Sequence, residues 1–338
     1  MIHRLHSCSV GAAFVLLMLT FVSSMAFAQN VRVFDRTPIR FAAGQATGSA
    51  GVQVEDHGRM VEKLVILPEF EGPVRVYANL LIEPVPKDEL SVHDKWDRAG
   101  NVRLSRTGLP DLELVKFVTA YGGRTEHRVD VSHMISWLAG PTTFRAFIDT
   151  WVDPAWQVTL SLEFEFDSAF VAPTWVRSLV FEPSYSFEAQ ADTGLDAHIQ
   201  VPAGLDRVEL QYLVSGHCTD GRGADEFVPK DNVISVDGRV VYRYRPWRDD
   251  CRDVRALNPY TKKWSDGTWS SDFSRSGWCP GDVVEPLELD LTDHLGSGAH
   301  TVNFTIENVR PKDADGHHGY WRISARLIGW SNLPPGTP

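Results

Sequence analysis

Side chains that could take part in catalysis or substrate binding are concentrated in two stretches of this sequence. One is Trp96-Asp97-Arg98, where a carboxylate stands between an aromatic ring and a guanidinium, directly ahead of a strand-like segment. The other covers residues 215–281 and combines a carboxylate-bearing turn with two cysteines, four tryptophans and several arginines. A carboxylate can orient or deprotonate water, and an arginine offers directed donors to a carboxylate or a hydroxyl group. The competing interpretation of Asp97 is an ordinary ion pair with Arg98.

The second stretch is expected to be folded. A connection of this length is uncommon in a compact domain unless it builds a site or is disordered. Disorder is disfavoured because a solvated linker would not carry so many large apolar side chains. These tryptophans are Trp247, Trp264, Trp269 and Trp278. We therefore expect residues 215–281 to form a functional loop.

Two cysteines can close this loop. A bridge between Cys251 and Cys279 would span 28 residues. Such a bridge stabilises a fold by roughly 3 kcal/mol in the chain-entropy model. Cys218 is then either a buried free thiol or a partner of one of the other two. An oxidising compartment is required for the bridge.

The start of the chain predicts export to such a compartment. Residues 1–28 read as a signal peptide, with a positive beginning, an apolar core and a small-x-small sequence before Gln29. The apolar run is short for a membrane span, and an uncleaved anchor is the alternative. We therefore expect a secreted or periplasmic protein that has no membrane contact after cleavage.

Composition limits the partners. The net charge of −11 argues against nucleic acid, whose binding depends on Lys and Arg. The chain has 11 tryptophans, and aromatic faces stack on sugar rings, so a carbohydrate ligand is admissible. The competing interpretation is that most of these rings fill hydrophobic cores. We expect a monomer.

The residue pattern predicts an all-β protein. Short segments rich in Val, Ile, Phe and Tyr often alternate with polar residues and end at Gly, Pro or Asp. Residues 129–140 read as a short turn or helix. Similar Asp-x-(Ser/Thr) turns at Asp130 and Asp290 hint at two related sandwiches in tandem. A boundary within residues 170–175 divides the chain into domains 30–172 and 173–338.

Five stretches resemble the peptide-N-glycosidase F family, in an order that fits from about residue 31 to 330. They are HDKWDRAGNVRL, AFIDTWV, GRGADEFVPKDNVISVDG, CRDVRALNP and SRSGWCPGDVV. The resemblance implies two eight-stranded antiparallel jelly-roll domains packed side by side, with the site in the cleft between them. It also implies metal-independent and cofactor-free hydrolysis of the amide bond between an N-linked glycan and asparagine in glycoproteins or glycopeptides. The glycan would leave as a glycosylamine, and asparagine would become aspartate.

The resemblance assigns catalytic roles to three acids. Asp97 would be the principal carboxylate, and Glu226 would contact substrate from the other domain. Facing carboxylates raise each other's pKa, so that one can act as an acid and the other as a base. Asp149 stands where the family usually has Glu, and its shorter side chain retracts the carboxylate by roughly 1.5 Å, a displacement that can cost about a hundredfold in rate.

Substrate contacts are also implied, for Arg98, Trp151, Arg275 and Trp278. Trp151 would be a sugar platform or a wall that orients Arg98, and a place in the core is the alternative. Arg275 would hold a carboxylate or a glycan hydroxyl, and a structural pair with an acid of residues 249–253 is the alternative.

The turn at Glu226 departs from the family pattern. The type member flanks this acid with two close cysteines, whereas this chain has Ala224 and Val228. The turn therefore lacks a pair of cysteines that could hold it in place. A solvated loop acid is the competing interpretation of Glu226.

Two other functions remain open. One is a non-catalytic carbohydrate-binding, glycopeptide-binding or surface protein with the same fold; the joint presence of Asp97, Glu226 and Arg275 favours the enzyme. The other is a copper monooxygenase similar to the peptidylglycine-hydroxylating enzymes, with histidines as ligands. The candidates are His217, His294, His317 and His318. The sequence has no His-x-His pair on a strand-like segment, so no metal is expected.

Overall fold

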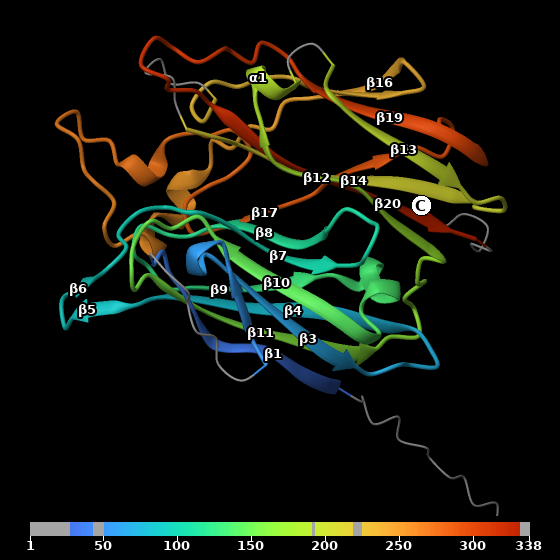
Figure 1. The fold of residues 1–338 in the computed structure, drawn as a ribbon, viewed down its shortest axis with the longest axis horizontal. Helices are drawn as coiled ribbons and strands as arrows, with labels where there is room; N and C mark the ends of the chain where they lie inside the picture. Colours follow the sequence, from blue (N-terminus) through green and yellow to red (C-terminus); the bar gives the residue numbers. More distant parts are fainter. Residues whose placement is uncertain (1–27, 43–50, 191–192, 219–224, 332–338) are drawn as a thin grey trace, which may run out of the picture.

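Figure 1 shows two β-sandwich units side by side, one from each half of the chain. The structure is a computed structural model that describes residues 28–42, 51–190, 193–218 and 225–331. Paired strands run antiparallel throughout this described part. The prediction of two antiparallel eight-stranded jelly-roll units is confirmed, since four strands face four in each unit and two short strands extend one sheet.

The first unit encloses one hydrophobic core between two sheets. The 4-stranded sheet contains, in order, β1 (Ala28–Ile39), β11 (Trp156–Phe166), β4 (Val74–Pro84) and β9 (Thr125–Asp130). The 6-stranded sheet contains β17 (Val283–Val284), β8 (Leu112–Val118), β7 (Ala99–Ser105), β10 (Gly140–Ile148), β3 (Met60–Leu67) and β2 (Gln53–Glu55). The smaller elements are η1 (Asp56–Gly58), η2 (Ser132–Trp137), β5 (Pro86–Asp88) and β6 (Ser91–Val92).

The second unit has its own core between two 4-stranded sheets. One contains β12 (Trp175–Tyr185), β20 (Tyr320–Trp330), β14 (Arg207–His217) and β18 (Leu287–Asp290). The other contains β13 (Leu195–Val201), β19 (Gly298–Ile306), β15 (Asn232–Val236) and β16 (Arg239–Tyr244). Its short helices are α1 (Phe187–Gln190), η3 (Cys251–Leu257) and η4 (Ser270–Asp272).

Alternating side chains explain why these segments become strands. In β4 every second residue from Val74 to Ile82 is buried, and the residues between them are half-buried. Successive side chains of a strand point to opposite faces, so this pattern turns one apolar face to the core. Each such Val, Leu or Ile contributes about 2 kcal/mol when it is fully buried.

β8 shows no alternation, because both of its faces are covered. All seven of its residues are buried, Glu113 and Lys116 included. Lys116 Nζ donates to the Arg322 carbonyl oxygen of β20 at 2.8 Å and lies 3.4 Å from the Glu113 carboxylate. Ser324 of β20 donates to the same carboxylate. The two units therefore meet through buried polar groups that find partners across the boundary.

The two similar turns noted in the sequence have the same geometry. Asp130 ends β9 and accepts a hydrogen bond from the Ser132 backbone N–H at 2.9 Å. Asp290 ends β18 and accepts one from the Thr292 N–H at 2.9 Å. Each turn leads from the edge of one sheet into an inner strand of the other, β10 or β19. The short helix expected within residues 129–140 is η2.

Some sequence predictions stay predictions. The boundary between residues 172 and 173 falls in the connection between β11 and β12. The proposed signal peptide, residues 1–28, lies outside the described residues except for Ala28, with which β1 begins. Within the described part, no helix is both long and apolar enough to span a membrane.

Candidate active site

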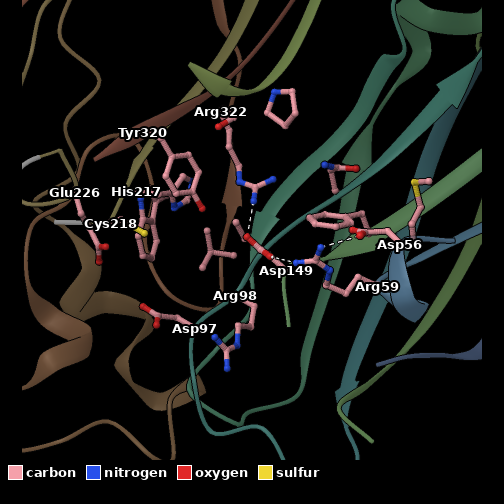
Figure 2. A pocket seen from close by; sticks show the side chains of 18 of the residues that line it. Asp56, Arg59, Asp97, Arg98, Asp149, His217, Cys218, Glu226, Tyr320 and Arg322 are labelled. Atoms are coloured by element: carbon pink, nitrogen blue, oxygen red, sulfur yellow. Dashed lines mark hydrogen bonds and ion pairs between the residues drawn. The ribbon is translucent and has the colours of Figure 1, made fainter. Parts of the chain in front are cut away.

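A cavity of about 710 Å³ lies between the two units and contains the three predicted acids. Asp97 enters it from the connection between β6 and β7, and Asp149 from directly after β10. Glu226 comes from the other unit, on the turn between β14 and β15. Arg98 and Trp151 also line the cavity. Figure 2 shows Asp97 and Glu226 facing each other.

Arg275 joins these two acids. Its Nε donates to Glu226 Oε1 at 3.2 Å, and its Nη2 lies 3.8 Å from Asp97 Oδ2. The guanidinium is only 1% exposed, and it is sandwiched between the rings of Phe227 and Trp278 at 5.1 and 4.9 Å. Arg275 thus holds carboxylates, as one of the sequence interpretations expected, and the alternative pair within residues 249–253 is not what the structure shows.

The acid pair is electrostatically perturbed. Burial raises the pKa of both carboxyls, and the charge of Asp97 raises the pKa of Glu226 further, to about 7, against the opposing effect of Arg275. The Tyr121 hydroxyl oxygen accepts a hydrogen bond from Arg275 Nη2 at 3.3 Å, and burial together with the charge of Asp97 raises the pKa of Tyr121. Near neutral pH, one carboxyl of the pair can therefore hold a proton while the other is charged.

A residue that the sequence analysis missed sets the position of Asp97. Asp94 is fully buried and accepts hydrogen bonds from Arg98 Nε at 2.9 Å and Nη2 at 3.1 Å. It also accepts from Thr150 Oγ1 at 2.6 Å and Trp156 Nε1 at 3.2 Å. The expected alternative of an Asp97–Arg98 pair is therefore wrong, because Asp94 takes Arg98 and leaves Asp97 to the cavity. The one sequence signal was a second aspartate four residues before Arg98.

The turn at Glu226 has supports in place of the missing cysteines. The Ser276 N–H donates to the Glu226 carbonyl oxygen at 2.9 Å, and the Glu226 N–H donates to the Cys218 carbonyl oxygen at 3.3 Å. Lys230 forms an ion pair with the neighbouring Asp225. Glu226 is consequently a half-buried, fixed acid rather than a solvated one. Cys218 is a free thiol but an exposed one, contrary to the expectation of burial.

Asp149 is held by two arginines that the sequence analysis did not consider. Arg59 Nη1 donates to Oδ1 at 3.1 Å, and Arg322 Nη2 donates to Oδ2 at 2.6 Å (Figure 2). Arg59 precedes β3 of the first unit, whereas Arg322 lies on β20 of the second. Asp149 does not contact Arg98, which is held by Asp94.

The two candidate tryptophans differ. Trp151 is 59% exposed, so it is no core residue, and its ring lies 4.7 Å from the guanidinium of Arg59 instead of orienting Arg98. Trp278 is only 2% exposed, and its Nε1 donates to the Gly216 carbonyl oxygen at 2.7 Å. Trp278 also lines the cavity and lies 4.9 Å from the Arg275 guanidinium, so it supports Arg275, and its predicted contact with substrate stays a prediction.

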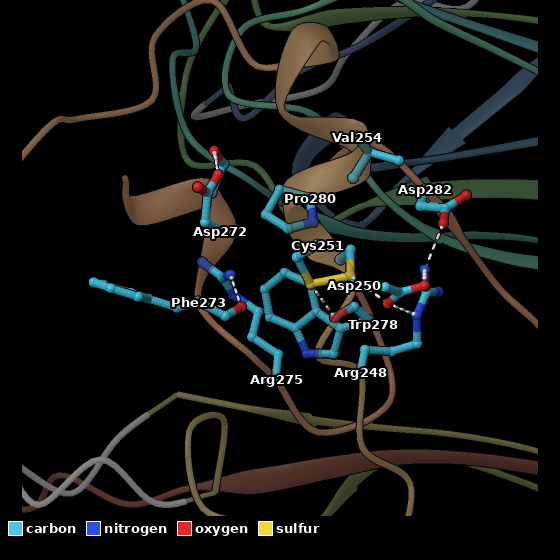
Figure 3. Close-up of a disulfide and its surroundings, with 12 residues drawn as sticks. Arg248, Asp250, Cys251, Val254, Asp272, Phe273, Arg275, Trp278, Pro280 and Asp282 are labelled. Carbon is cyan, nitrogen blue, oxygen red and sulfur yellow. Dashed lines mark hydrogen bonds and ion pairs between the residues drawn. A yellow bond between two sulfur atoms is a disulfide. The ribbon is translucent and has the colours of Figure 1, made fainter. Parts of the chain in front are cut away.

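Residues 215–281 are not a single loop, because β15 and β16 lie within them, but the part between β16 and β17 that carries Arg275 is folded and closed by a disulfide as expected. Cys251 and Cys279 form a disulfide, and both are fully buried (Figure 3). Beside it, Arg248 binds Asp250 at 2.6 Å and Asp282 at 3.1 Å. The loop therefore gives Arg275 a rigid base.

The candidate copper ligands are engaged in other contacts. The buried ring of His217 stacks between Trp278 and Tyr320, at 5.3 and 5.6 Å between centroids. His317 pairs with Asp313 on the surface. Among the described residues there are three compact His/Cys/Asp/Glu clusters; one of them, formed by Asp313, Asp315 and His317, includes a candidate copper ligand, and none contains one of the three catalytic candidates.

Comparisons with known proteins agree with this architecture. The family model described as "Peptide-N-glycosidase F, C terminal" matches residues 184–328. No curated protein matches the chain. The solved structure of PNGF-II superposes with a TM-score of 0.80 at 24% identity; the match covers 92% of this chain and 66% of that one, so this chain spans slightly less than two thirds of its length.

Two further solved structures match over nearly their whole length. PNGase F, a glycosylasparaginase from Flavobacterium meningosepticum, matches with a TM-score of 0.72 at 19% identity, over 91% of this chain and 97% of that one. A peptide-N(4)-(N-acetyl-β-D-glucosaminyl) asparagine amidase matches with a TM-score of 0.71 at 20% identity, with the same coverage. Residues 184–328 thus match the peptide-N-glycosidase F family by sequence, both units match its solved structures by fold, and the resemblance expected from the sequence is confirmed.

Proposed function

We propose that this protein is an N-glycan amidase. It hydrolyses the bond between an N-linked glycan and asparagine in glycoproteins or glycopeptides, releases a glycosylamine and leaves aspartate. The observation that carries this proposal is that Asp97 and Glu226, one from each unit, line one cavity and are joined by the buried Arg275.

The two carboxyls have complementary roles in this reaction. Asp97, charged, orients a water molecule and takes its proton while the water oxygen bonds to the amide carbon. Glu226, protonated because its pKa is raised to about 7, gives its proton to the glycan-linked nitrogen as the C–N bond breaks. Arg275 fixes the separation of the two acids through its hydrogen bond to Glu226 and its ion pair with Asp97.

The rest of the cavity suits a sugar. Trp151 presents an exposed ring on which a sugar face can stack, and its guanidinium neighbour Arg59 keeps that ring in place. Arg98 adds directed donors for hydroxyl groups. Asp149, although shorter than the family acid, is fixed by Arg59 and Arg322 from both sides.

Export to an oxidising compartment belongs to the same proposal. The buried disulfide between Cys251 and Cys279 persists only where thiols are oxidised. A signal peptide at residues 1–28 would deliver the chain there, and the protein would act as a secreted or periplasmic monomer with domains 30–172 and 173–338.

One assay tests the activity. A denatured N-glycosylated protein is incubated with the purified protein, and the peptides are analysed by mass for conversion of Asn to Asp at glycosylation sites. Glycan release by the parent and not by Asp97→Asn supports the proposal. A parent that binds glycopeptide but releases no glycan at any pH would instead establish a carbohydrate-binding protein with this fold.

A further inference from the structure

A second cavity, of about 960 Å³, is lined largely by aromatic rings. The rings come from the first unit and from the long loop of the second unit. They include Trp96, Tyr121, Phe227, Tyr260, Trp264 and Phe273. We refer to it as the aromatic cavity.

Three of the exposed large side chains line this cavity. Trp96 is 62% exposed, Trp264 43% and Phe273 36%. Large rings that gather at the surface of a soluble protein mark a binding site more often than chance exposure does. Aromatic side chains are also the residues that contribute most to recognition of polypeptides.

The aromatic cavity adjoins the cavity of about 710 Å³ that holds the acids, here called the polar cavity, although no described residue lines both. Trp96 directly precedes Asp97, and Phe227 directly follows Glu226. Tyr121 and Arg275 line the aromatic cavity, and Arg275 Nη2 donates to the Tyr121 hydroxyl oxygen at 3.3 Å and lies 3.8 Å from Asp97 Oδ2. A substrate whose reacting bond lies at the two carboxyls therefore meets the polar cavity on one side and the rings on the other.

The two parts of the proposed substrate, the glycan and the polypeptide, differ in polarity as the two cavities do. The polar cavity offers charged groups such as Arg59, Asp149 and Arg322, which suit a hydroxyl-rich sugar. We propose that the aromatic cavity binds the polypeptide on either side of the glycosylated asparagine, with preference for apolar and aromatic side chains. This inference rests on the proposed amidase function and names the part of the substrate that the second cavity takes.

The aromatic cavity is built in advance. The Tyr260 N–H donates to the Tyr121 carbonyl oxygen at 3.1 Å, and its hydroxyl donates to the Leu90 carbonyl oxygen at 3.1 Å. Lys95 lies 4.7 Å from the ring of Tyr260, and Lys262 lies 3.9 Å from that of Trp264. Rings that are held in place before binding lose little conformational entropy, which favours affinity.

The test compares two substrates that carry the same glycan. One is a single glycosylated asparagine blocked at both ends, and the other is a longer glycopeptide with aromatic residues around the asparagine. The measured quantity is the ratio of kcat/KM for the long substrate to that for the short one. Trp264→Ala and Phe273→Ala should each lower this ratio by roughly tenfold, because truncation of a contact ring commonly costs about that factor. Phe166→Ala is the matched control, since Phe166 is 57% exposed outside the aromatic cavity, and its ratio should equal that of the parent.

An unchanged ratio in both Trp264→Ala and Phe273→Ala would overturn the inference while glycan release itself continued. Calorimetric titration of the glycan-free peptide gives a second reading that needs no catalysis. The parent should bind this peptide more tightly than Trp264→Ala does. If Trp264→Ala instead weakens binding of the free oligosaccharide and leaves peptide binding intact, the aromatic cavity takes sugar and the inference is wrong.

Discussion

Asp97 and Glu226 share one buried arginine, and this sharing explains why their protons are usable near neutral pH. One guanidinium balances one negative charge, so a second charge on the pair is costly in a buried site. The pair therefore tends to keep a proton. Hydrolysis of an amide needs such a pair, because the water loses a proton while the leaving nitrogen gains one.

The first prediction concerns Asp97. The variant Asp97→Asn keeps the size of the side chain but removes the base, so glycan release should fall by roughly a hundredfold or more. The melting temperature should stay close to that of the parent, since Asp94 and not Asp97 holds the surrounding turn. Release rates are measured by mass analysis of glycopeptides. Near-parental turnover in a folded variant would remove Asp97 from the mechanism.

The second prediction concerns pH. Glu226 must be protonated to act as an acid, and its pKa in the free protein is raised from 4.5 to about 7, so kcat/KM should fall as pH rises through about 7. The same shift makes the folded state bind the proton more tightly than the unfolded state does. The free energy of unfolding should therefore decrease as pH rises from 4.5 to about 7.

Glu226→Gln provides the control for this profile. The amide does not titrate, so the variant should lose the Glu226 part of the pH dependence of stability and most of the activity. Denaturant unfolding at several pH values, beside a pH–rate profile, measures both. An alkaline limb of kcat/KM that persists in Glu226→Gln would assign that limb to another group.

At the scale of elements, the loop between β16 and β17 does more than connect two strands. It carries Arg275 on a base closed by Cys251 and Cys279, and it then continues into β17, which joins the sheet of the first unit beside β8. The Asn258 side chain accepts the Tyr121 N–H at 2.9 Å, which docks the loop on the first unit. The loop therefore places a residue of the second half against Asp97.

The third prediction tests this element. Replacement of both Cys251 and Cys279 by serine should lower stability by roughly 3 kcal/mol and loosen the loop, because the unfolded chain regains the entropy that the bridge removes. Glycan release should fall as Arg275 loses its fixed position. Chemical unfolding and non-reducing peptide mapping check both points, with Cys218→Ser as the matched control. Mapping that found Cys218 linked to Cys251 or Cys279 would contradict the pairing.

At the scale of the whole molecule, the cavity depends on how the two units are held together. Their boundary contains buried charges with partners, such as Lys116 against the Arg322 carbonyl oxygen. Asp149 adds an ion pair across the same boundary, from the end of β10 to Arg322 on β20. A buried polar interface is costly to open unless every group is rematched, so the units keep one mutual placement.

The fourth prediction follows from Asp149. The variant Asp149→Ala leaves Arg59 and Arg322 without their shared carboxylate, so stability should fall by roughly 2 kcal/mol, which is less than for a fully buried pair because these side chains are partly exposed. Glycan release should fall more than about tenfold, since a charge network loses its centre. Thermal unfolding and release rates are compared with those of Asp149→Asn, which keeps the shape without the charge. Release as fast as that of the parent would show that Asp149 is no part of the site.

The sequence by itself determined the all-β class, the repeated turn at Asp130 and Asp290, and the residue types of the site. These features are encoded locally, since alternation of apolar side chains and the chemistry of a short turn depend on neighbours in the chain. The pairing of Cys251 with Cys279 was also predictable, because few cysteines compete for partners.

Only the tertiary structure decided which charged groups pair. Arg98 could have joined Asp97, but Asp94 lies in the fully buried position where several donors converge, and it takes Arg98. Likewise, Arg275 lies between Asp97 and Glu226 because a loop of one unit packs against a turn of the other. Sequence spacing cannot predict such choices, since the strength of a charge pair depends on its burial and on competing partners that folding brings from distant strands.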